Sequence, residues 1–377
     1  MAEDRKVIRP DLDFVRRIVA SGGDTVKQCM QCANCSVACE LSPTDQPFPR
    51  KEMILAQWGL KEELFNDPDI WLCFGCTDCS IQCPRGARPG DVLAAVRKEV
   101  IREYTPIGSV QKALESPKYL PILILVPVVL WSLIYLVFGK AENEAQHYFD
   151  GIFPPGILEP LLGVMTMTGC LIFALGAFKY WKSLLKAHPA PAGANFVGAV
   201  MAAAGDIISH AKFRKCEAGE SRALGHMLMF YGFSLIFIGG SIVGIGFMFG
   251  MLELPLPFFH PLKLMLNLGA AGLVIGSILL LKYRLTRPER QTRGTWYDWF
   301  FMYSLLLTGI TGVTVEAFRM LDIQAVAFGI YFIHLICVFC LLGYAPWSKI
   351  AHLVYRSVAL VHAHYTGREK KAWPVKR

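Results

Sequence analysis

Apolar residues gather into six long runs in the last two thirds of the 377-residue chain. Each run is long enough for an α-helix to cross the hydrocarbon core of a bilayer, which takes about 20 residues. The runs cover residues 119–138, 157–178, 224–250, 261–281, 296–316 and 323–347. The pattern therefore predicts six membrane-spanning helices in a multi-pass protein of the cell's inner membrane.

The basic residues between these runs are distributed unevenly. The segments after the second, fourth and sixth runs hold 7, 5 and 7 Lys and Arg residues, whereas those after the first and fifth hold one each and that after the third none. Cytoplasmic loops of membrane proteins carry the excess of basic residues, so both termini are predicted to lie in the cytoplasm. The opening segment, MAEDRKVIRPDLDF, lacks the apolar core of a signal peptide and agrees with this orientation.

The net charge of +8 has the same explanation. Residues 1–118 hold 16 basic and 17 acidic residues, and residues 119–377 hold the remaining 22 basic and 13 acidic residues. The basic excess therefore belongs to the apolar part of the chain. Membrane orientation explains it better than binding to nucleic acid.

The spacing of apolar residues in the first 118 positions predicts a separate, helical domain. Residues 50–66 and 90–104 repeat apolar side chains at helical spacing, and strand patterns are weak. We therefore expect an all-α protein with a helical ferredoxin-like head and a six-helix membrane domain. The expected boundaries are 1–118 for the head, 119–352 for the membrane domain and 353–377 for a basic tail.

The connection between the second and third runs, residues 195–223, is long and partly apolar. Its apolar residues predict a helix that lies in the membrane surface. They are Phe196, Val197, Val200, Met201, Ile207 and Ile208. The alternative is a plain connector.

Eight of the twelve cysteines form two runs of the same spacing. The runs are Cys29-x2-Cys32-x2-Cys35-x3-Cys39 and Cys73-x2-Cys76-x2-Cys79-x3-Cys83. This is the spacing of the bacterial [4Fe–4S] run, in which the fourth cysteine ligates the other cluster. The expected ligand sets are therefore Cys29, Cys32, Cys35 with Cys83, and Cys73, Cys76, Cys79 with Cys39.

Zinc sites and disulfides are the alternatives for these cysteines. Four-ligand zinc sites do not use four cysteines at this spacing. Disulfides are rare in the cytoplasm. The spacing favours two iron–sulfur clusters over both.

Among nine histidines, His334 and His352 are the most informative. They lie 18 residues apart, or five helical turns, so on one continuous helix their rings share a face about 27 Å apart. Ionisable residues inside a membrane are candidates for function. Paired histidines fill both axial positions of a low-spin haem. We therefore expect this pair to ligate b-type haem rather than to be ordinary hydrogen-bonded core.

Each of these histidines needs a partner at a matching depth. His226 opens the third run on the cytoplasmic side and matches His352. His260 opens the fourth run on the outer side and is the nearest match to His334. His210, in the connection before the third run, is a competing inner ligand.

Two parts of the sequence resemble known families. CMQCANCSVACE and WLCFGCTDCSIQCPRG resemble the small iron–sulfur subunit of heterodisulfide reductases, with Glu40 where a proline often follows the last cysteine. YFIHLICVFCLLGYAPWSKIAHLV and RALGHMLMFYGF are similar to the cytochrome b subunits of respiratory nitrate reductase and of membrane-bound heterodisulfide reductase. Fused in one chain, the two parts resemble the quinone-interacting membrane-bound oxidoreductases of sulfate reducers.

The resemblance implies a conduit for electrons. It implies that menaquinol is oxidised in a domain with two b haems and that electrons pass through two [4Fe–4S] clusters to heterodisulfide-reductase-like partner subunits that carry FAD. Flow in the opposite direction, toward quinone, is the alternative. Adenylylsulfate reductase is the implied final acceptor. The alternatives are the equivalent subunit of another heterodisulfide-reductase-type complex, and a membrane anchor or docking module without haem. An anchor does not need His226, His334 and His352, so these histidines favour the conduit.

Overall fold

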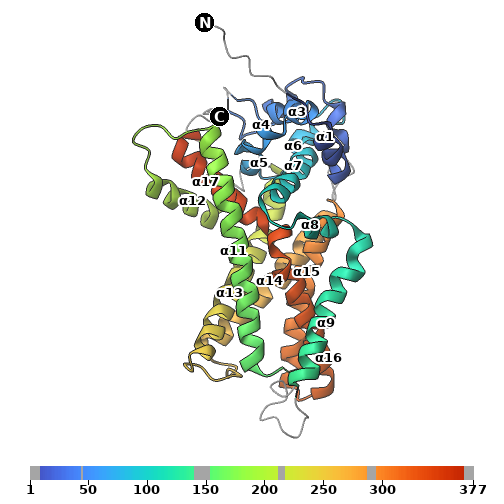
Figure 1. The fold of residues 1–377 in the computed structure, drawn as a ribbon, viewed down its shortest axis with the longest axis vertical. Helices are drawn as coiled ribbons and strands as arrows, with labels where there is room; N and C mark the ends of the chain where they lie inside the picture. Colours follow the sequence, from blue (N-terminus) through green and yellow to red (C-terminus); the bar gives the residue numbers. More distant parts are fainter. Residues whose placement is uncertain (1–8, 44–45, 140–152, 211–216, 287–293, 369–377) are drawn as a thin grey trace.

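The computed structural model describes residues 9–43, 46–139, 153–210, 217–286 and 294–368. Its regular structure is helical, and none of the described segments forms a strand. Figure 1 shows short helices gathered into a head at one end of the molecule and long helices running away from it side by side. The predicted all-α class is confirmed for these residues.

The head is built around helix α7, Pro89–Tyr104. Its residues Val92, Val96 and Val100 recur every four positions and form one buried stripe. Five short helices contact α7: α1 Leu12–Ile18, α3 Arg50–Gln57, α4 Lys61–Phe65, α5 Asp69–Leu72 and α6 Asp78–Ile81. Helix α2, Asn34–Val37, lies against α6. Of the two segments predicted to be helical in the head, residues 90–104 lie within α7, whereas residues 50–66 form two short helices, α3 and α4, with residues 58–60 between them.

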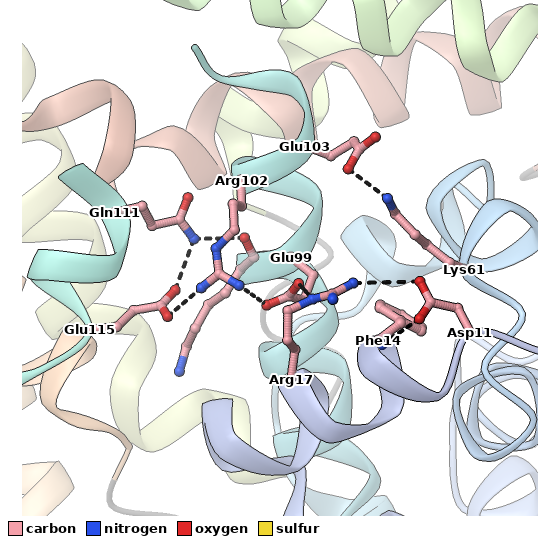
Figure 2. Close-up of polar contacts among 10 residues, drawn as sticks. Asp11, Phe14, Arg17, Lys61, Glu99, Arg102, Glu103, Gln111 and Glu115 are labelled. Atoms are coloured by element: carbon pink, nitrogen blue, oxygen red, sulfur yellow. Dashed lines mark hydrogen bonds and ion pairs between the residues drawn. The ribbon is translucent and has the colours of Figure 1, made fainter. Parts of the chain in front are cut away.

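An ion-pair network joins this core to α8, Gly108–Leu114, which leads to the first long helix (Figure 2). The buried carboxylate of Glu99 binds Arg17 of α1, at 2.9 Å from its Nε, and also binds Arg102. Arg102 also binds Glu115, and the side-chain amide of Gln111 donates to the Glu115 carboxylate at 3.0 Å. A buried carboxylate is costly without such partners. The network therefore holds α1, α7 and α8 in one arrangement.

Six described segments are long and apolar enough to cross a membrane, as expected of a multi-pass membrane protein. They correspond to the six predicted runs. The long helices are α9 Leu120–Phe138, α11 Pro155–Ala187, α13 Glu217–Met248, α14 Pro261–Leu285, α15 Trp296–Met320 and α16 Gln324–Val338. Large apolar side chains such as Leu133 and Leu171 are exposed on them. That surface suits contact with lipid.

The predicted last run, 323–347, is not one continuous helix. Helix α16 ends at Val338 and is followed by a π-helical turn, Phe339–Gly343, and a 3₁₀ turn, Ala345–Trp347. Pro346 interrupts the helix because it lacks an amide hydrogen. Trp347 Nε1 then donates to the carbonyl of Pro106, at 2.6 Å, and anchors the break to the head.

The chain beyond this break forms helix α17, Ala351–Thr366. His334 and His352 therefore lie on different helices, and the prediction that they share one helix face about 27 Å apart is wrong. Most of α17 falls within the segment that the sequence assigned to a basic tail from residue 353. The helix lies beside the head rather than extending away from it (Figure 1).

Helix α17 completes the core of the head. Ala351, Tyr355 and Ala359 are buried in the same cluster of side chains as the apolar residues of α1, α3 and α7. The ring of Tyr355 stacks on Trp71 of α5, with centroids 5.5 Å apart. Its hydroxyl lies 3.1 Å from Thr105 Oγ1. The head and the membrane helices therefore share one core.

The segment between the second and third long helices forms α12, Phe196–Ser209, which packs on α17. Ala199 and Ala203 are buried, whereas Val197, Met201 and Ile208 are exposed. The segment is thus a helix with an apolar outer face rather than an irregular connector.

Glycines bring the backbones of α13 and α14 into direct contact. A Cβ atom at Gly232 of α13 would lie 2.5 Å from the Leu273 nitrogen, and one at Gly276 of α14 would lie 2.4 Å from the Met229 nitrogen. No side chain fits at such distances from a main-chain atom. Small residues serve this purpose between membrane helices, where close packing replaces the hydrophobic effect.

Replacing Gly276 with valine should therefore force α13 and α14 apart and lower the free energy of unfolding by about 1–3 kcal/mol. Thermal unfolding of the purified protein in detergent measures the effect. The matched control is Gly240→Val on α13, since a Cβ at Gly240 meets no atom within 4 Å. Equal melting temperatures for the two variants would contradict the proposed contact.

Candidate metal centres

Both cysteine runs follow the same main-chain path. Left-handed φ angles occur two and four residues after the first cysteine of each run, at Gln31 (59°) and Ala33 (69°), and at Gly75 (61°) and Thr77 (75°). A four-residue helix follows each time, α2 and α6. Such angles are uncommon for residues other than glycine and concentrate at functional sites. Here they curl each run so that its first three thiols converge.

The structure brings the eight cysteines together in two groups that mix the runs. The first group, which lines one small cavity, consists of Cys29, Cys32, Cys35 and Cys83. The second group, whose thiols oppose one another's ionisation, consists of Cys73, Cys76, Cys79 and Cys39. In each group the fourth cysteine of one run joins the first three of the other. The sequence predicts the same grouping.

The thiols fit an iron–sulfur cluster electrostatically. Burial, together with the neighbouring Cys73, raises the pKa of the Cys39 thiol to about 12. Burial and the neighbouring Cys29 likewise raise the pKa of the Cys35 thiol to about 11. Buried thiolates at this spacing need a compensating cation, which the iron of a cluster supplies. The Gly75 amide donates to Cys73 Sγ at 3.2 Å, as is usual for cluster ligands.

A larger cavity, of about 370 Å³, lies between the head and the long helices. His226 of α13 and His352 of α17 both line it, as the predicted inner pair requires. His210, at the end of α12, lines it too, and its ring centroid lies 5.4 Å from that of His226. Cys73 is part of the same wall. The cavity therefore joins the predicted inner haem ligands to the second cysteine group.

His352 is prepared for metal binding by its surroundings. Its Nδ1 lies within hydrogen-bond distance of the Lys349 carbonyl, so Nδ1 carries the proton and donates it there. Burial lowers the pKa of His352 to about 4, so the imidazole is neutral near pH 7. Its Nε2 then has a free lone pair. Histidines that ligate metals are oriented by this kind of hydrogen bond.

The remaining walls of the cavity differ in character. One part is apolar and includes Met229, Phe230, Phe233, Phe301 and Leu305. Another part is charged, with a cationic excess: the carboxylates of Asp206 and Asp298, the latter paired with Lys349, face the cations Arg97, Arg222, Arg284, Lys349 and Arg356. A haem is a flat apolar ring with two carboxylates on one edge. The residues present therefore fit a b-type haem.

His334 occupies a second, separate position on α16. The hydroxyl of Thr311 donates to the Leu307 carbonyl at 2.6 Å, so its oxygen accepts from His334 Nδ1 at 2.9 Å. The ring lies close to α15 because a Cβ at Gly312 would be 3.0 Å from His334 Cε1. The Nε2 atom of His334 is therefore also in the form that can bind a metal.

His260 is placed differently from the sequence expectation. It is the N-cap of α14, and its Nδ1 accepts the amide hydrogen of Leu262 at 3.3 Å. An imidazole that accepts at Nδ1 carries its proton on Nε2 and has no lone pair left for a metal. Among the contacts of the described residues, none joins His260 to His334. The structure thus brings together the inner pair but not the outer one.

Sequence reasoning missed the arginines of the cavity. Arg222 lies four residues before His226, and Arg356 lies four residues after His352. Residues four apart share a helix face, so each guanidinium lies one turn from a candidate ligand. This spacing is visible in the sequence and is the signal that could have identified them.

Comparison with known proteins supports an iron–sulfur domain in the head. Residues 25–87 match the family described as a 4Fe-4S dicluster domain. A subunit of the H(2):CoB-CoM heterodisulfide,ferredoxin reductase of Methanothermobacter marburgensis is 36% identical over 93 residues, which are 24% of this chain and 50% of that protein. A protein of Archaeoglobus profundus, named as similar to a heterodisulfide reductase subunit, is 37% identical over 89 residues, 23% of this chain and 47% of that protein.

A third relative is the iron–sulfur subunit of the CoB–CoM heterodisulfide reductase of Methanopyrus kandleri, 32% identical over 73 residues, 19% of this chain and 38% of that protein. The chain spans about half the length of the first two relatives. No solved structure matches the chain significantly. The N-terminal part of this chain is therefore an iron–sulfur module homologous to the iron–sulfur subunit of heterodisulfide reductases, joined to six helices long enough to span a membrane.

Proposed function

We propose that this chain is the membrane subunit of a quinone-interacting oxidoreductase. It transfers electrons between menaquinol and heterodisulfide-reductase-like flavin and iron–sulfur subunits, through haem b and two [4Fe–4S] clusters. The observation that carries the proposal is the shared cavity, since His226, His352 and Cys73 all line it. Carriers bound at these points are neighbours, which short-range electron transfer requires.

The protein's part is to supply ligands, spacing and potential. When bound, haem and iron–sulfur clusters provide the one-electron chemistry. His226 and His352 hold the inner haem from two different helices, α13 and α17. His334 is the ligand that α16 offers to an outer haem. His260, its partner in the sequence prediction, can serve only after it releases the Leu262 amide.

The head passes electrons on to soluble partners. Its relatives are named as subunits of reductases that act on a CoB-CoM heterodisulfide. We propose related flavin-containing partner subunits here, with adenylylsulfate reductase as the final acceptor in sulfate reduction. The uneven distribution of basic residues among the loops supports our proposal that the head and both ends of the chain lie in the cytoplasm.

Replacing His352 with leucine tests the inner haem. The variant should lose about half of the b-type α-band in a reduced-minus-oxidised spectrum of the purified full-length chain, because one of two haems has lost a ligand. His188→Ala is the control, because this exposed histidine lines neither cavity. A membrane anchor without haem would show no b-type band in any variant, including the unmodified protein.

Replacing Cys39 with alanine tests the mixed cysteine groups. The expected result is the loss of about four iron atoms per chain, because a cubane loses one of its four ligands. Cys83→Ala should cost the same amount of iron from the other group. Cys170→Ala is the control, since this cysteine is exposed on α11 and belongs to neither group. If the Cys39→Ala protein retains all its iron, the assignment of this ligand is wrong.

A further inference from the structure

Three arginines from three different helices reach one short segment of the head, residues 70–75, which carries Cys73. Arg97 of α7 donates to the carbonyls of Ile70, at 2.5 Å, and Cys73, at 3.0 Å. Arg356 of α17 donates to the carbonyls of Trp71, at 2.9 Å, Cys73, at 3.0 Å, and Leu72, at 3.4 Å.

Arg222 of α13 completes the set, because it donates to the carbonyls of Gly75, at 2.8 Å, and Phe74. Every main-chain carbonyl from residue 70 to residue 75 therefore accepts a hydrogen bond from a guanidinium. We call this segment the arginine-bound loop. Its carbonyls point to the cations, while the Gly75 amide points to the sulfur of Cys73.

The other cysteine run has a different environment. The carbonyls of Val26 and Cys29 accept hydrogen bonds from Gln57 Nε2, a neutral amide, at 2.9 Å each. Among the described contacts, no guanidinium donates to a carbonyl of residues 26–35. Arg50 and Arg85 line the neighbouring cavity, but Arg85 is exposed, and solvent screens its charge. The two cysteine groups thus differ in the number of cations bound to their loops.

The two groups also differ in position. Cys73 lies in the wall of the cavity that His226 and His352 line. The group of Cys29 lines a separate cavity, and its Cys32 is exposed at the surface of the head. A carrier held by His226 and His352 is therefore adjacent to the second group and more remote from the first.

We propose that Arg97, Arg222 and Arg356 make the cluster on Cys73, Cys76, Cys79 and Cys39 the higher-potential cluster and the first to exchange electrons with the haem cavity. A cluster gains one negative charge when it is reduced, and partly buried cations stabilise that charge. The step moves one electron from ferrous haem to an oxidised cluster, which leaves ferric haem and a reduced cluster. No bond or proton changes place. The cluster of the Cys29 group is then the exit toward soluble partners.

This inference rests on the proposed function and predicts a difference between the reduction potentials of the two clusters, which the proposed function alone does not require. The arginines act as positioning residues, because two of their helices also carry the haem ligands one turn away. Arg222 precedes His226 on α13, and Arg356 follows His352 on α17. The same two helices therefore fix the ligands and the arginine-bound loop relative to each other.

The test is a redox titration of both clusters, followed by electron paramagnetic resonance, on the purified full-length chain. Arg356→Gln keeps a hydrogen-bond donor but removes the charge. It should lower the ratio of reduced to oxidised cluster about tenfold at a fixed potential, or ~59 mV for one electron, for one cluster only. Arg356→Lys should restore most of the shift because it keeps the charge. Arg16→Gln, an exposed arginine on α1, should change neither cluster.

The same titration in a chain that holds only one cluster identifies the cluster whose potential shifts. In a Cys83→Ala chain, which lacks the cluster of the Cys29 group, the remaining signal should still shift with Arg356→Gln. An equal shift of both clusters, or no shift of either, would overturn the inference. Absence of clusters from the unmodified chain would instead refute the proposed function. If the Arg356→Gln chain fails to fold, Arg97→Gln and Arg222→Gln provide the same measurement.

Discussion

The stacked rings of Trp71 and Tyr355 hold α17 against the head, and the ring of Tyr355 also contacts Tyr180 of the long helix α11, so the arrangement of both candidate centres depends on this contact. Trp71 lies two residues before Cys73, and Tyr355 lies three residues after His352. Both rings are buried in the core that the head shares with α11 and α17. The second cysteine group cannot move away from the cavity without opening that core. Because electron transfer weakens steeply with separation, a rigid junction serves this protein better than a flexible linker between two domains.

Features that depend on local patterns could be predicted from the sequence. Each of the six apolar runs contains a helical segment long and apolar enough to span a bilayer, because these two properties can be determined from the sequence. The fourth cysteine of each run joins the opposite group, as its x3 spacing indicates, because the helix that follows each loop carries it away from the first three. His226 and His352 line one cavity, as their matched depths suggested.

Features that depend on contacts between distant parts of the chain could not be predicted from the sequence. Pro346 indicates a break, but the direction of α17 after it is set by the hydrogen bond of Trp347 to Pro106, 241 positions away. His260 is of a residue type that ligates haem, yet its ring accepts a hydrogen bond from the Leu262 amide in the first turn of α14. The arginine-bound loop needs side chains from α7, α13 and α17, whose meeting no single segment of sequence reveals.

The shared core also imposes an order on biosynthesis. Residues 351–366 leave the ribosome after every other helix described here, yet Ala351, Tyr355 and Ala359 belong to the core of the domain made first. Domains usually fold during translation from the N-terminus onward. Here the iron–sulfur domain must wait for the whole membrane region to be inserted before its core closes. Loading of cofactors at the junction is therefore a late event, and a chain truncated before α17 would leave the metal-binding domain without part of its core.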